Sequence, residues 1–265
     1  MDMPRNTFKQ ALAERRPQLG LFLGLANPIS AEIMATCGYD FLLIDAEHGP
    51  NNVPLVQSQL QAMAPHPVQC LVRPANHDAA LIKQLLGVGA QTLLVPMVDN
   101  AEQARAIVSA MHYPPKGIRG VGTGLERGSR WNAVPDYFAQ VEANTCLIVQ
   151  IESRTALQNL DAIAAVEGVD AVFIGPSDLA ASMGHLGQPG HPEVKAAVEQ
   201  ALKRITAAGK AAGVFCADPA MVESFQASGA SFLALGADTG LLRSAATKLI
   251  NSVRPQSVRA AGAGY

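Results

Sequence analysis

Polar side chains stand directly after several short apolar runs of this sequence, and their types are those of acid, base and metal chemistry. They are Asp45, Glu47 and His48 in DAEHGP, Arg73 in VRP, Gln150 and Glu152 in VQIE, and Ser177 and Asp178 in GPSD, where Gly175 and Pro176 precede them. Acids, an arginine and a histidine on one rim suffice for proton transfer or for a divalent cation beside an anion-stabilising group. The interpretation depends on whether the fold brings these run ends together.

Glu152 and Asp178 fit either a general acid and base pair or the ligands of a hard divalent cation. Ions such as Mg²⁺ bind one or two carboxylates and complete their coordination with water and substrate oxygens. The alternative is that each carboxylate caps the following helix or pairs with a surface cation. A zinc site is not expected, because the sequence has no HxxxH or CxxC spacing and its histidines are scattered.

Arg73 and His48 are candidates for charge stabilisation and for proton transfer. Arg73 ends an apolar run, so its guanidinium needs either a substrate oxyanion or a structural salt bridge to Asp45 or Glu47. His48 is the histidine at a run end and the natural base near neutral pH; the alternative is a loop histidine satisfied by its neighbours. Schiff-base chemistry is not expected, because no lysine follows a predicted strand.

The composition favours a large apolar core and excludes several partner classes. The chain has 265 residues, of which 49% are hydrophobic and 16% charged, and its net charge is -2. Without a basic excess and with 5% aromatic residues, nucleic acid is not an expected partner. No run approaches the ~18 apolar residues that span a bilayer, and the first eighteen residues lack a signal-peptide core, so we expect a cytoplasmic protein without a membrane partner.

The apolar runs recur along the chain and are separated by segments with helical periodicity. They cover residues 19–24, 41–44, 68–72, 92–98, 145–151, 171–174, 212–215 and 232–235. Continuous apolar runs are typical of parallel strands covered on both faces, and 193–208 is typical of the helices between them. Eight such units predict one α/β domain over 1–253, a (β/α)8 TIM barrel with its site at the carboxyl ends of the strands. Residues 254–265 are predicted to form a flexible tail.

Two other features give weaker expectations. The connections 113–135 and 182–192 are unusually long, and long loops in compact domains are often functional. The four cysteines are expected to pack as small apolar side chains, because they are far apart and mostly lie within or beside apolar runs.

The residues together resemble the HpcH/HpaI family of class II pyruvate aldolases from about Pro17 to Lys248. The segments that carry the resemblance are FLLIDAEHGPNN, VRP, IKQLL, TLLVPMV, YPPKGIRGVG, SRWN, VQIE and DAVFIGPSDLAASMG. The resemblance implies a homohexamer of barrels with an exchanged C-terminal helix and a Mg²⁺, Mn²⁺ or Co²⁺ ion. It also implies reversible cleavage of 4-hydroxy-2-oxo acids, such as 4-hydroxy-2-oxoheptanedioate, to pyruvate and an aldehyde such as succinic semialdehyde, in the catabolism of aromatic compounds.

The resemblance also implies roles for the strand-end residues. Glu152 and Asp178 would hold the metal, Arg73 would stabilise the enolate oxygen, and Asp45 belongs to the catalytic group. His48 would remove the C4-hydroxyl proton, directly or through a water. Substrate contacts are implied for Gln150, Gly175, Pro176, Ser177, Asp178 and Arg73, with the Ser177 backbone N–H at the carboxylate.

The chain departs from the family immediately after KQLL, where Gly87 stands. Well-known members carry an Asp there, which a neighbouring subunit contributes to raise the basicity of the histidine. We therefore expect either that Asp45 supplies this support or that His48 is a weaker base.

Three rival functions use the same residues. The first is a lyase for 2-keto-3-deoxy sugar acids of the glucarate or rhamnonate type. The second is a lyase for a CoA thioester, which needs a basic patch beyond Arg119, Arg127 and Arg130. The third is a noncatalytic 2-oxo acid binder, which would bind pyruvate without turnover; the complete polar rim argues against it.

Overall fold

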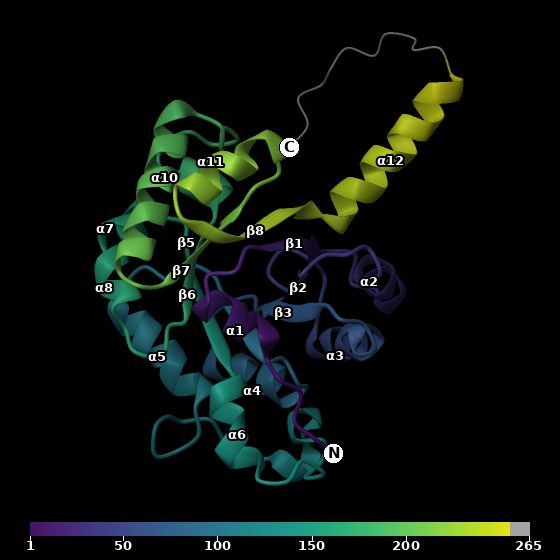
Figure 1. Cartoon of the computed structure of the whole chain (residues 1–265), viewed down its shortest axis with the longest axis vertical. Helices are drawn as coiled ribbons and strands as arrows, with labels where there is room; N and C mark the ends of the chain where they lie inside the picture. The colour runs from purple at the N-terminus through teal and green to yellow at the C-terminus, as the bar shows by residue number, and fades with distance from the viewer. Residues whose placement is uncertain (255–265) are drawn as a thin grey trace.

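A closed barrel of parallel strands forms the centre of the molecule in the computed structural model, which describes residues 1–254 (Figure 1). The strands are β1 (Gln18–Leu23), β2 (Phe41–Asp45), β3 (Gln69–Arg73), β4 (Thr92–Val95), β5 (Cys146–Ile151), β6 (Ala171–Ile174), β7 (Ala211–Phe215) and β8 (Ala230–Ala237). Each strand pairs with its successor in the sequence, and β8 closes the barrel on β1. The predicted α/β barrel is confirmed.

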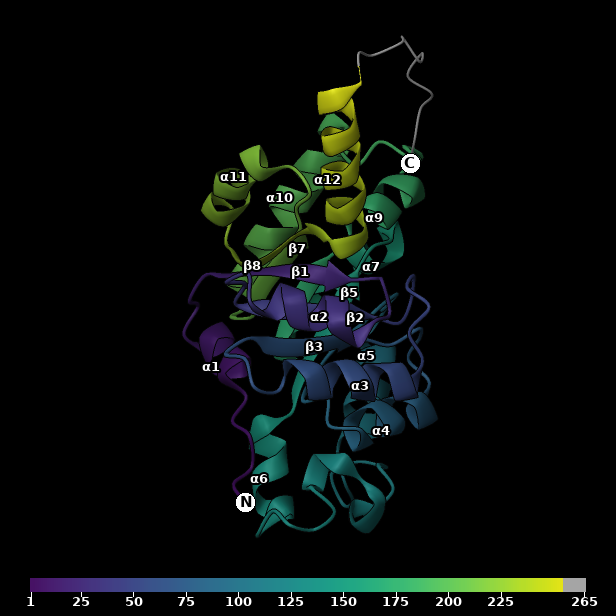
Figure 2. The ribbon, with the colours of Figure 1, turned by 90° about the vertical axis from the view of Figure 1, so that its right-hand side faces the viewer.

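Helices cover the outside of the barrel and connect the strands (Figure 2). They are α1 (Thr7–Ala13), α2 (Pro28–Ala35), α3 (Val53–Met63), α4 (Ala79–Gly87), α5 (Ala101–Met111), α6 (Tyr137–Asn144), α7 (Arg154–Gln158), α8 (Leu160–Ala164), α9 (Pro176–Ser182), α10 (Pro192–Ala207), α11 (Val222–Ala227) and α12 (Asp238–Val253), with 3-10 turns η1 (Thr123–Leu125), η2 (Arg127–Ser129) and η3 (Pro219–Met221). The helix predicted over 193–208 is α10, which begins one residue earlier at Pro192.

The barrel interior is filled by aromatic side chains that face small residues on neighbouring strands. A Cβ added to Gly20 would lie 2.4 Å from the ring of Phe41, and one added to Gly213 would lie 2.3 Å from the ring of Phe232. Phe8 of α1, the helix that precedes the first strand, packs edge-on against the rings of Phe41 and Phe232. These aromatic residues belong to the apolar cluster that fills the barrel.

The helix α12 differs from the other long helices because it leaves the barrel. Figures 1 and 2 both show it extending away from the body of the molecule after β8. Asp238 at its start is its one buried residue. Its exposed large apolar side chains are Leu241, Leu242, Leu249, Ile250 and Val253. The predicted tail lies, from residue 255 onward, outside the described residues.

The two long connections lie at different ends of the barrel. Residues 113–135 join α5 to α6 and lead back into β5, so they belong to the amino ends of the strands. Residues 182–192 join α9 to α10, which follow β6, so they belong to the carboxyl ends. Only the second connection is placed by the topology near a site built on strand ends.

The four cysteines differ in their exposure. The expectation that all cysteines pack as small apolar side chains is wrong for Cys37, which is exposed, because it lies in the turn after α2. Cys146 and Cys216 are buried and Cys70 is half-buried.

Among the described helices, none is both long enough and apolar enough to cross a membrane.

Candidate active site

The strand-end residues converge on a cavity of about 330 Å³ at the carboxyl end of the barrel. Of the residues singled out from the sequence, Asp45, His48, Arg73, Gln150, Gly175, Pro176, Ser177 and Asp178 line it. Glu152 lies behind these residues, and its carboxylate is close to both Gln150 and Gly175. The fold therefore brings together the residues that lie far apart in the sequence.

Glu152 is a buried carboxylate held from two sides. Its side chain follows β5 and the residue is 2% exposed. The Met97 N–H donates to its Oε1 at 2.8 Å, and the Gln150 side-chain amide donates to its Oε2. Burial raises the pKa of Glu152 to about 7, an effect that these two hydrogen bonds reduce and that nearby Glu47 and Asp178 increase. A cation at this carboxylate would favour its charged form.

Gly175 permits the close approach of β5 and β6 at this point. The register pairs Ile151 with Ile174, so the residue after each strand lies beside its counterpart. A Cβ on Gly175 would lie 2.7 Å from Glu152 Oε2 and 3.0 Å from Gln150 Nε2. Asp178 then stands in the first turn of α9, next to this pair of strands. The prediction that Glu152 and Asp178 follow neighbouring strands is confirmed.

Arg73 ends β3 and is almost fully enclosed by acids and an aromatic ring. Its Nε and Nη2 donate to the two carboxylate oxygens of Asp45 at 2.9 and 2.7 Å. Its Nη1 lies 2.9 Å from Glu47 Oε2 and donates to Gln150 Oε1 at 3.5 Å, and the guanidinium lies 4.9 Å from the Phe22 ring centroid. The salt bridge weighed against an oxyanion role is therefore present, and Nη1 also reaches the end of β5 through Gln150.

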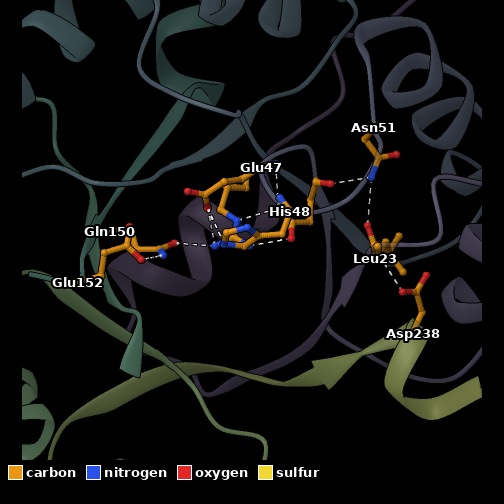
Figure 3. Close-up of polar contacts among 10 residues, drawn as sticks. Leu23, Glu47, His48, Asn51, Gln150, Glu152 and Asp238 are labelled. Atoms are coloured by element: carbon orange, nitrogen blue, oxygen red, sulfur yellow. Dashed lines mark hydrogen bonds and ion pairs between the residues drawn. The ribbon is translucent and has the colours of Figure 1, made fainter. Parts of the chain in front are cut away.

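His48 is the exposed member of the site. Its side chain is 63% exposed, and its Nε2 lies 3.7 Å from Glu47 Oε2. Asp45 accepts hydrogen bonds from the main-chain N–H groups of Glu47 and His48 at 3.1 and 3.4 Å, in addition to Arg73. Asp45 thus orders the turn that carries the imidazole, and Glu47 is the acid beside the ring. Figure 3 shows Glu47 and His48 facing Gln150 and Glu152 across the site.

Glu47 is the site residue to which the sequence argument gave no role beyond pairing with Arg73. Burial raises its pKa, Arg73 and His48 lower it, and Asp45 and Asp178 raise it. Its Oε2 is buried and has no well-aligned hydrogen-bond donor among the described residues. The signal was present in DAEHGP, but periodicity does not tell which way a side chain points once a strand has ended.

Two more residues hold the loops of the site and were not predicted. Asn51 donates through Nδ2 to the carbonyl of Asp45 at 2.7 Å and to that of Leu23 at 3.3 Å. Asp238 accepts from the Gly24 N–H at 2.8 Å, which joins the β1 end to the start of α12 (Figure 3). Their contacts fix the β1 and β2 ends relative to each other, and GPNN was the sequence signal for the first of them.

The acids of the site fit a hard divalent cation. Glu47, Glu152 and Asp178 belong to the same strand-end rim, and the charges of Glu47 and Asp178 contribute to the raised pKa of Glu152. Carboxylate and amide oxygens with room for water are the donors that Mg²⁺ and Mn²⁺ prefer. Arg73 offsets part of this negative charge, and its contacts are already taken by Asp45 and Glu47. A divalent ion would offset more of it.

A second group of possible metal ligands lies outside the site, on the long connection and the start of α10. The ligand atoms of His185, His191 and Glu193 lie within 4.8 Å of one another. The two imidazole rings stack at 3.6 Å with an interplanar angle of 16°. Because the lone pair of a ring nitrogen lies in the ring plane, two stacked rings in this arrangement do not point at one ion. The contacts are those of side chains packed within a loop.

Comparison with known proteins identifies relatives along almost the whole chain. The family profile described as HpcH/HpaI aldolase/citrate lyase matches residues 18–245. A hydroxypyruvate/pyruvate aldolase of Deinococcus radiodurans is 59% identical over 97% of this chain and 93% of its own length. A 4-hydroxy-2-oxo-heptane-1,7-dioate aldolase of Klebsiella pneumoniae is 57% identical over 92% of each chain. The crystal structure of a Burkholderia cenocepacia protein, described as a member of the same family, superimposes with a TM-score of 0.90 at 37% identity over 94% of this chain and 99% of that chain.

Proposed function

Because the chain belongs to the HpcH/HpaI aldolase/citrate lyase family, we propose that it is a divalent-metal-dependent aldolase that reversibly cleaves 4-hydroxy-2-oxo acids to pyruvate and an aldehyde. The observation that carries the proposal is the buried Glu152 carboxylate beside Asp178, across a cavity from Arg73 and His48. The names of the relatives support aldol chemistry with 2-oxo acids.

Glu152 and Asp178 are the residues that would hold the ion, and a bound ion would polarise the 2-oxo group of the substrate as a Lewis acid. Gln150 lies between Glu152 and Arg73, so its amide is placed to contact the same end of the substrate. The main-chain N–H of Ser177, in the first turn of α9, is a donor for the substrate carboxylate.

In the cleavage direction His48 accepts the proton of the C4 hydroxyl. The C3–C4 bond then breaks, its electron pair forms the enolate of pyruvate, and C4 leaves as the aldehyde carbonyl. Arg73 stabilises the negative charge that develops on the C2 oxygen, because its planar guanidinium is fixed by Asp45 before the substrate arrives. The protonated His48, directly or through a water, returns the proton to C3 of the enolate, which completes the formation of pyruvate and restores the base.

A second donor is supported by the relatives. The Deinococcus radiodurans relative is named for hydroxypyruvate as well as pyruvate. We therefore include hydroxypyruvate among the donors of the condensation direction. Cleavage of 2-keto-3-deoxy sugar acids uses the same bond chemistry and is the alternative within the family.

We also propose that the chain acts as a homohexamer in which α12 is exchanged between copies. The support is the apolar surface of α12, which includes Leu242, Leu249 and Val253 and which its own barrel does not cover. An exposed apolar stripe on a long helix is normally buried against another element.

The experiment is a cleavage screen of the chelator-treated protein. Mg²⁺, Mn²⁺, Co²⁺ or Zn²⁺ is added back, and pyruvate release is measured from 4-hydroxy-2-oxoheptanedioate and from 2-keto-3-deoxy acids. We expect turnover with one or more of the first three ions and none before addition. Binding of pyruvate in the presence of Mn²⁺ without turnover of any substrate would identify a noncatalytic binder instead.

A further inference from the structure

The space beside Gly87 is occupied by the carboxyl group of Glu126. A Cβ added to Gly87, at the end of α4, would lie 3.3 Å from Cγ and Cδ of Glu126 and 3.5 Å from its Oε1. Glu126 lies between η1 and η2 in the long connection that follows α5. A carboxylate therefore stands directly in front of the position where this chain lacks a side chain.

Glu126 is held by one of its two oxygens. Oε2 lies 3.2 Å from Arg119 Nη2 and accepts from the Tyr113 hydroxyl at 3.5 Å. Arg119 is itself buried and lies 4.5 Å from the Tyr113 ring centroid, which fixes the guanidinium. No donor within residues 1–254 contacts Oε1. This oxygen is available to a donor from another molecule.

The surface around Glu126 is apolar and its own catalytic histidine is out of reach. Gly87 and the 113–135 connection precede β4 and β5 at the amino ends of the strands, whereas His48 follows the carboxyl end of β2. Large apolar side chains of the same connection are exposed at Ile118, Val121, Leu125 and Trp131, and Leu125 is 90% exposed. Such a surface is typical of a contact between copies of a chain.

We propose that Glu126 of one copy of this chain acts as a positioning residue for His48 of a second copy, by accepting a hydrogen bond from the imidazole through Oε1. The inference rests on the proposed function, in which His48 is the base. Among residues 1–254 the exposed imidazole forms an ion pair with Glu47 alone, whose Oε2 also lies 2.9 Å from Arg73. A carboxylate from a second copy would orient the ring and favour its protonated form.

The neighbours of Glu126 set the size of the effect. Arg119 and Tyr113 face its carboxylate, and the positive charge of Arg119 offsets part of the negative charge that the imidazole would meet. We therefore expect a loss on the order of tenfold in kcat, not of all activity, when the charge is removed. We also expect Gly87→Asp alone to give no gain, because the new carboxylate would contact Glu126.

Hybrid oligomers test whether the carboxylate acts between copies. His48→Ala and Glu126→Gln chains are co-expressed with different tags, and the mixed oligomer is purified and compared with each single variant. Roughly one quarter of the sites in a random mixture pair an intact His48 with an intact Glu126, so activity should recover to about that fraction of wild type. Activity no higher than the mean of the two single variants would overturn action between copies.

A pair of variants that match in shape and differ in charge tests the carboxylate itself. The pair also keeps the inference testable if the Glu126→Gln chain fails to assemble. In the Glu126→Ala background, Gly87→Asp restores a carboxylate to this space, and Gly87→Asn restores its shape without the charge. We expect Gly87→Asp to raise kcat and to move the ascending limb of the pH profile to higher pH than Gly87→Asn does. Equal kinetics of the two double variants would overturn the inference.

Two controls separate this inference from its premise. Glu142→Gln removes an exposed acid of α6, which pairs with Lys116, and should leave kinetics unchanged. Wild-type protein that releases no pyruvate with any ion would overturn the proposed function. Normal wild-type turnover with an unchanged rate and pH profile in Glu126→Gln would overturn only the role of Glu126.

Discussion

The two halves of the strand-end rim differ in how completely a single chain holds them. In the half formed by β5 and β6, Glu152 is buried and both of its oxygens accept hydrogen bonds. In the half formed by β2 and β3, Arg73 is equally buried, but His48 is 63% exposed and touches one acid at 3.7 Å. The proposed charge-stabilising group is therefore held in place before substrate binds, whereas most of the ring of the proposed base is left open by its own chain.

Removing the acid of the β5 and β6 half should have the largest effect. Glu152→Gln keeps the size of the side chain and one of its two acceptor oxygens but removes the negative charge, so we expect metal affinity to fall and cleavage to drop by more than about 10³-fold. Asp178→Ala should act in the same way. Titration with Mn²⁺ and the rate of pyruvate release measure both effects.

Glu193→Gln is the matched control, because it removes an acid from the histidine cluster outside the cavity. Its metal dependence should equal that of wild type. Near-native metal affinity and rate in Glu152→Gln would show that this residue supports the loop at Met97 instead of holding an ion.

Removing the base tests the exposed half of the rim. His48→Ala should slow cleavage by about 10²- to 10³-fold, because general base catalysis is lost. Pyruvate and Mn²⁺ binding should remain, since the imidazole contacts neither Glu152 nor Asp178 in this structure. An unchanged rate, or loss of metal binding, would mean that another group takes the proton.

Arg73→Lys tests whether the buried guanidinium does more than pair with acids. Lysine keeps the charge but loses the planar donor fork that Asp45 orients, so we expect a loss of about 10²-fold in kcat with the fold retained. Circular dichroism and thermal unfolding check the fold. Loss of folding, or unchanged kinetics, would favour a purely structural salt bridge.

The smallest effect is on stability without metal. Burial raises the pKa of Glu152 to about 7 from the ordinary 4.5, so its protonated form stabilises the fold below about pH 4.5 and this contribution is lost as pH rises through about 7. Glu152→Gln removes that dependence. Between these pH values the free energy of unfolding of wild type should therefore fall by at most about 3 kcal/mol relative to that of Glu152→Gln. Urea unfolding in the presence of chelator measures this difference. A constant difference across that range would contradict the raised pKa.

The sequence was sufficient for the barrel and for one half of the rim. Parallel strands place their carboxyl ends together, so the polar residues that end apolar runs had to meet, and Glu152 and Asp178 follow neighbouring strands as predicted. Gly175 was singled out in the same GPSD motif as Asp178. The structure adds its role, which is to allow the close approach to Glu152.

Other contacts were not predictable because they depend on turn and loop geometry. The direction of Glu47 after β2 decides which acid stands beside His48, and apolar periodicity ends at the strand. The meeting of Gly87 and Glu126 joins α4 to a loop 39 residues later whose conformation no short motif specifies. The proposed covering of α12 by other copies of the chain is a contact between molecules, which one sequence does not place.

The central claim is that Glu152 and Asp178 hold an ion on which turnover depends. The most direct measurement is pyruvate release from 4-hydroxy-2-oxoheptanedioate by chelator-treated wild type, before and after Mn²⁺ is added, with bound metal quantified in the same samples. We expect no release and no bound metal before addition, full recovery after it, and no recovery in Asp178→Ala. Full activity in excess chelator with no metal bound would contradict the account.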